Sequence, residues 1–151
     1  MNLKALVDKK NIILNLNIES KKRLIEFFAN RLSDMCPNIE EDTVIESIYR
    51  RERIGNTYIG KNIYIPHCKV ENLNITKIII TTLKKGYYDD VVDDDIKIAV
   101  GVFFPNKVND VHTELLKQLS FYLKNSTTQK YFTEIRKAND LYQLIIENSH
   151  E

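Results

Sequence analysis

The clearest strand signal lies in residues 75–83, which read I-T-K-I-I-I-T-T-L. Isoleucine and threonine dominate this run, and β-branched side chains favour the extended backbone of a sheet. A second apolar run covers residues 96–104 and stops at Pro105-Asn106, a pair of residue types common in turns. Both runs are therefore predicted to be strands, and the neighbouring segments are interpreted around them.

Two further strand signals lie upstream. Residues 11–18 mix Ile13, Leu14 and Leu16 with polar residues, which indicates a first strand. Residues 59–66 are interpreted as a loop that leads into a short strand at residues 63–65. The middle of the chain therefore changes from helical to strand periodicity.

Helical signals begin between the first strand and this middle region. Ser20 is a candidate N-cap, because its hydroxyl can accept a hydrogen bond from a free backbone N–H of the first turn. Apolar residues follow it at helical spacing as far as Met35. Asn38 and Glu41 then have the form of a capping box, which predicts a second helix.

The last third of the chain is predicted to hold three helices. Asn109 or Asp110 can cap the first, Ser126 and Gln129 form a capping box before the second, and Asn139 precedes the third. The complete order is one strand, two helices, several strands and three helices. This order predicts an α/β fold whose sheet is covered by helices on both faces.

Composition and charge describe an ordinary globular domain. A chain of 151 residues with 43% hydrophobic residues can bury a core as one domain. Lys and Arg total 22 against 21 Asp and Glu, so the net charge is +1 and does not favour binding to nucleic acid or to a membrane. The apolar runs are too short to span a bilayer, and residues 1–4 do not begin an uninterrupted apolar signal sequence. Two cysteines give no disulfide framework, so a cytoplasmic location is expected.

Three histidines are candidates for chemistry. His67 follows Ile65-Pro66 at the end of a predicted strand, where the proline ring stiffens the backbone. His112 falls in the first turn of a predicted helix, where the helix dipole disfavours protonation of the imidazole. His150 lies in the terminal tail, where no functional role is expected.

The context of His67 is the most specific feature of the sequence. Residues 51–68 read R-E-R-I-G-N-T-Y-I-G-K-N-I-Y-I-P-H-C. This segment resembles the signature of type-2 enzyme IIA domains, the fructose, mannitol and nitrogen-regulatory branch of the bacterial phosphotransferase system. In that family an Arg-Glu pair leads through a loop containing Gly and Thr to Ile-Pro-His. The matching positions here are Arg51-Glu52, Gly55, Thr57, Gly60 and Ile65-Pro66-His67.

The resemblance continues beyond this segment. A second family histidine opens a helix shortly after a strand that ends in proline, and His112 after Pro105 matches it. Residues 139–146 resemble the closing helix of the nitrogen-regulatory branch. The likeness therefore covers nearly the whole chain.

Membership of this family implies a fold and a function. The expected fold is a three-layer α/β/α domain over residues 1–151, with a mixed sheet of four or five strands. The expected function is to accept a phosphoryl group on His67 from an HPr-like phosphocarrier protein, without a metal or another cofactor. Arg51 is expected to stabilise the phosphoryl charge, and His112 to stabilise and orient the group. The protein would thus be a component of a phosphotransferase relay rather than an enzyme that turns over a small molecule.

Three functional interpretations stay open at this point. The nitrogen-regulatory branch is favoured because the domain stands alone, and its partners would be regulatory target proteins. The first alternative is a sugar-specific IIA component that donates phosphate to a separate IIB domain. The second is an interaction module that has the fold but carries no phosphate. Neither nucleic-acid binding nor direct membrane insertion is expected.

The sequence departs from the family pattern at three places. Cys68 stands where the family usually has glycine, Asn56-Thr57-Tyr58 replaces Ser-Thr-Gly, and Asn62 replaces the glycine before the strand. Cys68 raises the possibility of a thiol nucleophile, or of a zinc site with His67 and His112. Adjacent residues of an extended chain point to opposite faces, which argues against a direct pair between Cys68 and His67.

The acidic residues 89–95 raise a separate question. Five carboxylates lie within these seven residues, which could form a metal-binding loop. The spacing lacks the glycine and the terminal glutamate of a calcium-binding EF-hand loop. A solvated loop between two strands is the favoured interpretation.

Overall fold

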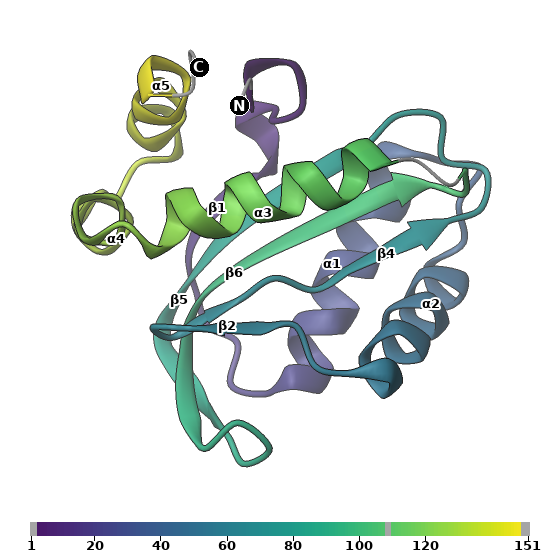
Figure 1. Ribbon diagram of the computed structural model, residues 1–151, viewed down its shortest axis with the longest axis horizontal. Coiled ribbons are helices and arrows are strands. Elements are labelled where there is room, and N and C mark those ends of the chain that lie inside the picture. The colour runs from purple at the N-terminus through teal and green to yellow at the C-terminus, as the bar shows by residue number, and fades with distance from the viewer. Residues whose placement is uncertain (1–2, 108–109, 149–151) are drawn as a thin grey trace.

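The computed structural model describes residues 3–107 and 110–148 and shows a mixed sheet with helices on both faces (Figure 1). The strands are β1 Ile12–Leu16, β2 Tyr58–Gly60, β3 Ile63–Tyr64, β4 His67–Val70, β5 Lys77–Asp89 and β6 Asp94–Pro105. The α-helices are α1 Lys21–Met35, α2 Glu41–Ile54, α3 Asp110–Lys124, α4 Ser126–Glu134 and α5 Ala138–Asn148. Two short 3₁₀ helices, η1 Leu3–Ala5 and η2 Lys9–Asn11, precede β1.

The long hairpin of β5 and β6 forms the centre of the sheet. The order across the sheet is β1-β5-β6-β3-β2, and β4 also pairs with β6. β1 runs parallel to β5, and both β3 and β4 run parallel to β6, whereas β2 and β3 are antiparallel. The mixed sheet expected from the sequence is confirmed.

Strands β3 and β4 lie end to end along β6. Tyr64 pairs with Ala99 and His67 with Val102, so the register is unchanged across the interruption. Pro66 stands between the two strands and has no N–H to donate to the ladder, although its carbonyl accepts from Val102 N at 3.0 Å. The sheet is therefore five strands wide, as expected, although its described part contains six strands.

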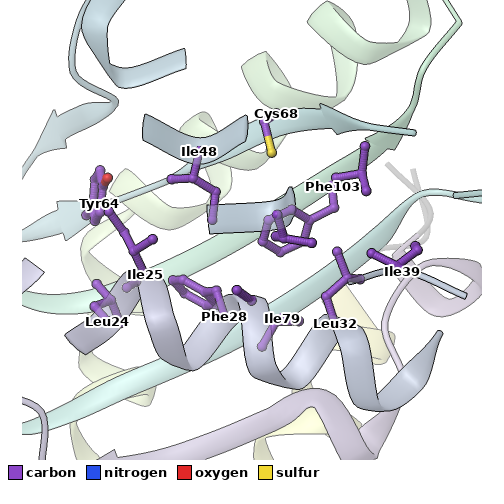
Figure 2. Close-up of a cluster of buried hydrophobic side chains, with 14 of the residues drawn as sticks. Leu24, Ile25, Phe28, Leu32, Ile39, Ile48, Tyr64, Cys68, Ile79 and Phe103 are labelled. Atoms are coloured by element: carbon purple, nitrogen blue, oxygen red, sulfur yellow. The ribbon is translucent and has the colours of Figure 1, made fainter. Parts of the chain in front are cut away.

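Alternation along the central strands creates two separate cores. On β6, Ala99 and Phe103 face α1 and α2, whereas Val100 and Phe104 face the opposite side. The first core contains Phe28 of α1, whose ring meets Phe103 edge-on at 6.2 Å between centroids (Figure 2). The second core packs the other face of the sheet against η1, α3, α4 and α5. These two cores confirm the predicted α/β/α layers.

The predicted helix starts were correct for α1 but wrong at three others. Ser20 caps α1, with its Oγ accepting from Arg23 N at 3.2 Å. α2 begins after Glu40 without a side-chain cap, so Asn38 and Glu41 form no capping box. α4 is capped by Asn125, whose Oδ1 accepts from the first-turn amides, rather than by Ser126. Asn139 lies inside α5 rather than before it.

One candidate helix cap and the tail histidine lie beyond the part of the chain that the structure describes. Asn109 and His150 both lie outside the described ranges. Asp110, the other candidate cap, is the first residue of α3. None of the described helices is both long and apolar enough to cross a bilayer.

The acidic segment forms the tight connection between β5 and β6. Asp89 Oδ1 accepts a hydrogen bond from Val91 N at 2.9 Å, and Asp94 Oδ1 accepts one from Asp95 N at 2.9 Å. Both strands run further toward this turn than predicted, because Tyr88 pairs with Asp95 and Asp89 with Asp94, past residue 83 in β5 and before residue 96 in β6. Within residues 3–107 and 110–148, no three His, Cys, Asp or Glu side chains are grouped to hold a metal ion.

Candidate functional site

His67 is the first residue of β4, directly after the interruption at Pro66. Ile63 and Ile65 belong to the core beneath α3, whereas Tyr64 and Cys68 belong to the core beneath α1 and α2. Because side chains alternate along an extended chain, His67 projects on the α3 side of the sheet. Its side chain is half-buried there.

A backbone contact fixes the tautomer of the His67 ring. The distance from His67 Nδ1 to the carbonyl oxygen of Ile65 is 2.8 Å. A carbonyl oxygen only accepts hydrogen bonds, so in the neutral ring Nδ1 carries the proton. Nε2 is then the nitrogen with the free lone pair, and it is the nucleophilic atom of this side chain.

The surroundings of His67 favour this neutral form. Burial lowers its pKa, and the positive charge of Arg51 lowers it further, while the bond to Ile65 and the charge of Glu52 act in the opposite direction. Desolvation disfavours the charged imidazolium, because burial removes the hydration that stabilises its charge. A neutral, nucleophilic imidazole is therefore the resting state at pH 7.

We expect His67 to titrate below 6.5, the ordinary pKa of histidine. As the pH falls through that value, an unperturbed imidazole becomes half protonated, whereas His67 should stay mostly neutral. Two-bond ¹⁵N–¹H NMR spectra recorded between neutral and acid pH would report both the pKa and the tautomer. A pKa above 6.5, or a neutral ring protonated at Nε2, would contradict this assignment.

His112 is the second imidazole of the site. It lies in the first turn of α3, and its ring stacks on that of Phe104 with centroids 4.1 Å apart and planes inclined by 19°. Partial burial lowers the pKa of His112, and the positive charge of Lys69 contributes to the same shift. Phe104 thus fixes the plane of a neutral ring, a contact that spacing along the sequence could not reveal.

Arg51 enters the site from the last turn of α2. Its Nη1 donates to the carbonyl oxygen of Gly55 at 2.8 Å, so the guanidinium is held near the end of the helix. Its charge is close enough to His67 to influence the pKa of that ring. The guanidinium has five N–H donors, so others remain for an anion.

Glu52, the partner of Arg51 in the sequence motif, has a different role. Its side chain is 7% exposed, pairs with Lys21 of α1 at 3.0 Å and accepts from Thr57 Oγ1 at 2.8 Å. These contacts join the loop after α2 to helix α1. Arg51 therefore borders the site, whereas Glu52 fixes the loop between α2 and β2.

The two imidazoles and Arg51 share one surface hollow with a volume of about 450 Å³. His67 enters the hollow from β4, His112 from α3 and Arg51 from α2. Three elements that are distant in sequence therefore meet beside β4. Ile54, which is 82% exposed, and Leu116 supply apolar lining. The structure thus brings together all three residues that the sequence selected.

Cys68 contributes its backbone to this edge, but its side chain lies in the core. Figure 2 shows its sulfur among the side chains between the sheet and helices α1 and α2. Burial raises the pKa of the thiol to about 12, so almost none of it is thiolate near neutral pH. His67 and Cys68 point to opposite faces, which excludes the direct thiol–imidazole pair.

We expect Cys68 to resist thiol reagents in the folded protein. Ellman's reagent at pH 8 should modify Cys36, which is only half-buried, well before Cys68. In denaturant both thiols should react at similar rates. Rapid modification of Cys68 in the native protein, tested in a Cys36→Ser variant, would contradict the buried placement.

The remaining departures from the family pattern have local explanations. Asn62 has φ of 67°, a left-handed conformation that suits glycine and that asparagine tolerates better than most residues. Its Nδ2 donates to Asp94 Oδ1 at 3.1 Å and to the Asp95 carbonyl at 2.8 Å. Tyr58 of β2 also donates its hydroxyl to Asp94. These substitutions fasten the loop to the β5–β6 hairpin and leave the hollow open.

Comparison with known proteins agrees with this fold and identifies a family. Residues 5–148 match the family model described as "Phosphoenolpyruvate-dependent sugar phosphotransferase system, EIIA 2". A nitrogen regulatory protein of Pseudomonas aeruginosa is 26% identical over 136 residues, which cover 89% of this chain and 88% of the relative.

Two solved structures have the same fold. The nitrogen regulatory protein IIA-Ntr of Neisseria meningitidis superposes with a TM-score of 0.86 at 18% identity, over 95% of this chain and 98% of that one. The mannitol-specific enzyme IIA of Escherichia coli, solved in complex with phosphorylated enzyme IIB, gives a TM-score of 0.77 at 18% identity, over 95% and 100% of the two chains. The family match spans almost all of the described chain, so this protein belongs to the type-2 enzyme IIA family of the phosphoenolpyruvate-dependent sugar phosphotransferase system.

Proposed function

We propose that this protein is a phosphoryl carrier that accepts its phosphoryl group on Nε2 of His67. The observation that carries the proposal is the bond between His67 Nδ1 and the Ile65 carbonyl. This bond leaves the lone pair on Nε2, in a ring that lines the hollow shared with Arg51 and His112. The donor is a phosphohistidine carrier protein of the HPr type, and the relay takes place in the cytoplasm.

The transfer is an in-line displacement at phosphorus. The lone pair of His67 Nε2 forms a new N–P bond while the N–P bond of the donor histidine breaks, and its electron pair returns to the donor imidazole. The two imidazoles exchange one phosphoryl group, so no water, metal or additional base enters the balance. Charge on the three equatorial oxygens must be stabilised during the step.

Arg51 and His112 are proposed to supply this stabilisation. A guanidinium donates hydrogen bonds in a fork that fits phosphoryl oxygens, and Arg51 borders the hollow beside His67. The His112 ring is neutral and is fixed on Phe104, so its protonated nitrogen can donate one further hydrogen bond. Both groups are in position before the phosphoryl group arrives, which reduces the reorganisation needed in the transition state.

We expect His112→Ala to accept the phosphoryl group about 10- to 100-fold more slowly than the parent protein, the loss typical of one transition-state donor. The yield at long times should be unchanged, because the acceptor nitrogen remains. Quenched-flow sampling with phosphorylated carrier would give the rates. The matched control is Lys124→Ala at the other end of α3, which should transfer within about twofold of the parent. A His112→Ala variant as fast as this control would remove His112 from the mechanism.

The role downstream is proposed to be regulatory, as in the nitrogen regulatory relatives. Phosphorylation adds about −1.5 to −2 charges beside an exposed apolar residue, Ile54, and the cations Arg50 and Lys69. A partner that docks on this rim meets a different charge in each form. A regulatory target should therefore bind one form preferentially, by tenfold or more.

Two experiments test the function. Incubation with phosphoenolpyruvate, enzyme I and an HPr-like carrier, followed by intact-mass measurement, should show one phosphoryl adduct that is stable at neutral pH and lost in acid. Affinity capture with the phosphorylated and unphosphorylated forms should then identify a partner that discriminates between them. Rapid transfer to a IIB domain without such a partner would replace the regulatory role with the sugar-specific one. Absence of any adduct would favour an interaction module without phosphate.

A further inference from the structure

A second cavity lies at the end of the sheet opposite His67, and its lining is strongly basic. Its volume is about 420 Å³, and Lys61, Lys84, Lys85, Lys97 and Arg136 line it without any Asp or Glu. Figure 1 shows α4 and the turn between β2 and β3 at this end, away from the tip of β4. We propose that this cavity binds a small anion that carries two or more phosphate groups.

An irregularity in the central hairpin gathers three of these cations. Thr82 pairs with Ile98 and Tyr87 with Ile96, so residues 83–86 of β5 lie opposite Lys97 alone. In a regular strand Lys84 and Lys85 would point to opposite faces, but here both border the cavity. Gly86 makes this possible, because its φ is +74° and a Cβ would lie 2.5 Å from the Ile96 carbonyl oxygen.

The opposite wall is held by specific hydrogen bonds. Arg136, which follows α4, donates from Nη1 to Asn15 Oδ1 at 2.9 Å, and Asn15 N donates to Thr82 Oγ1 at 3.0 Å. Asn15 has φ of 56°, in the left-handed region. Lys61 donates from Nζ to the carbonyl oxygen of Lys124 at 3.1 Å. This bond orients the Lys61 ammonium group but does not neutralise its charge, because the acceptor is a neutral carbonyl. The cations are therefore attached to four different segments around one space.

Within the part of the chain that the structure describes, the cations of this cavity are not neutralised by ion pairs with protein carboxylates. Among the described residues, none of the five cations forms an ion pair with a carboxylate. Asp94 is near enough to Lys97 for their charges to interact, but it lies outside the lining and accepts hydrogen bonds from Tyr58 and Asn62. Five like charges around one space repel one another, and a bound polyanion would relieve this repulsion.

The size and chemistry of the cavity define the ligand class. A volume of about 420 Å³ lies within the range of small-molecule sites. Lysine is a point-charge binder of phosphate, and five cations exceed what one phosphate group can neutralise. The buried residues Ile98 and Phe132 also border the cavity and could contact an uncharged portion of a ligand. The shared chemistry is thus a diphosphate or triphosphate, either inorganic or attached to a small organic group.

Calorimetry with inorganic triphosphate, pyrophosphate and orthophosphate on the intact protein would test the proposal. At constant ionic strength, triphosphate should bind with a Kd at least tenfold lower than orthophosphate. Amide resonances of Thr82, Lys97 and Gln129 should shift on binding, whereas those around His67 and Arg51 should not. Comparison of ADP with pyrophosphate then distinguishes an organic ligand, which should bind more tightly as ADP, from an inorganic one.

Matched variants complete the test. Lys84→Gln/Lys97→Gln should raise the Kd for triphosphate at least tenfold, whereas Lys22→Gln/Lys130→Gln, with the same net charge but both changes elsewhere, should stay within twofold. If the double variant does not fold, the single variant Lys85→Gln replaces it, and we expect this variant to raise the Kd for triphosphate at least threefold. Equal losses in both double variants, no preference for triphosphate, shifts centred on His67, or tighter binding of an oligonucleotide than of ADP would each overturn the proposal. Phosphoryl acceptance at His67 is measured separately, so either result can fail alone.

Discussion

Replacement of His67 by Ala is expected to abolish phosphoryl acceptance, with a fall in rate of at least about a thousandfold. The expected loss is this large because the change removes the only atom proposed to form the new bond. We do not expect His112 to substitute for it, because its ring is held on Phe104 in a different element. Intact-mass measurement after incubation with the phosphorylated carrier would show whether an adduct forms.

The control for this experiment is the His112→Ala variant described above. It should become fully phosphorylated, although slowly, whereas His67→Ala should stay unmodified over the same period. Circular dichroism should show that both variants fold, because neither side chain is part of the two cores. A full adduct on His67→Ala, or an adduct that survives acid in the parent protein, would mean that another residue accepts the phosphoryl group.

Replacement of Phe28 by Ala should lower the free energy of unfolding by about 3–5 kcal/mol, the usual cost of truncating a buried aromatic side chain. Phe28 has no exposed surface, and its ring meets Phe27 and Phe103 edge-on at 6.0 and 6.2 Å between centroids. Figure 2 shows Phe28 beside Phe103. The cavity left by truncation would lie between α1 and the middle of β6. Urea unfolding followed by circular dichroism would measure the loss.

Phe121→Ala provides the matched control, because it makes the same chemical change on the surface of α3. Phe121 is 82% exposed, so its truncation should change the free energy of unfolding by no more than about 0.5 kcal/mol. Similar losses for the two variants would contradict the placement of Phe28 in the core. Phe28 lies on the α1 side of the sheet and His67 projects on the opposite side, so a folded fraction of Phe28→Ala should still accept the phosphoryl group.

Much of the fold could be predicted from local patterns. Most of the apolar run at residues 75–83 falls within β5, which begins at Lys77, and the run at residues 96–104 falls within β6. The Ser20 cap is also present. These features depend on neighbours in the chain, which the sequence shows directly. The predicted helix caps at Asn38 and Ser126 were wrong for a different reason. Several adjacent polar residues can cap a helix, and tertiary packing decides which of them does.

The interruption between β3 and β4 shows the limit of such patterns. Pro66 indicates a break in the backbone, but the sequence does not show that both halves pair with β6 in one register. That register turns His67 toward α3 and Cys68 toward α1 and α2. Strand pairing between residues distant in the chain therefore decides that the side chain of His67 borders the hollow and that the side chain of Cys68 lies in the core.

The sequence by itself determined the family, the three-layer architecture and the residues His67, His112 and Arg51 as candidates, because a specific motif and apolar periodicity are properties of the chain alone. Only the tertiary structure showed that these three side chains border one hollow and that Nδ1 of His67 bonds the Ile65 carbonyl. It alone gathered the cations of the second cavity, which are spread from Lys61 to Arg136. The physical reason is that ring orientation, burial and the clustering of charges depend on contacts between distant segments, which form only when the chain is folded.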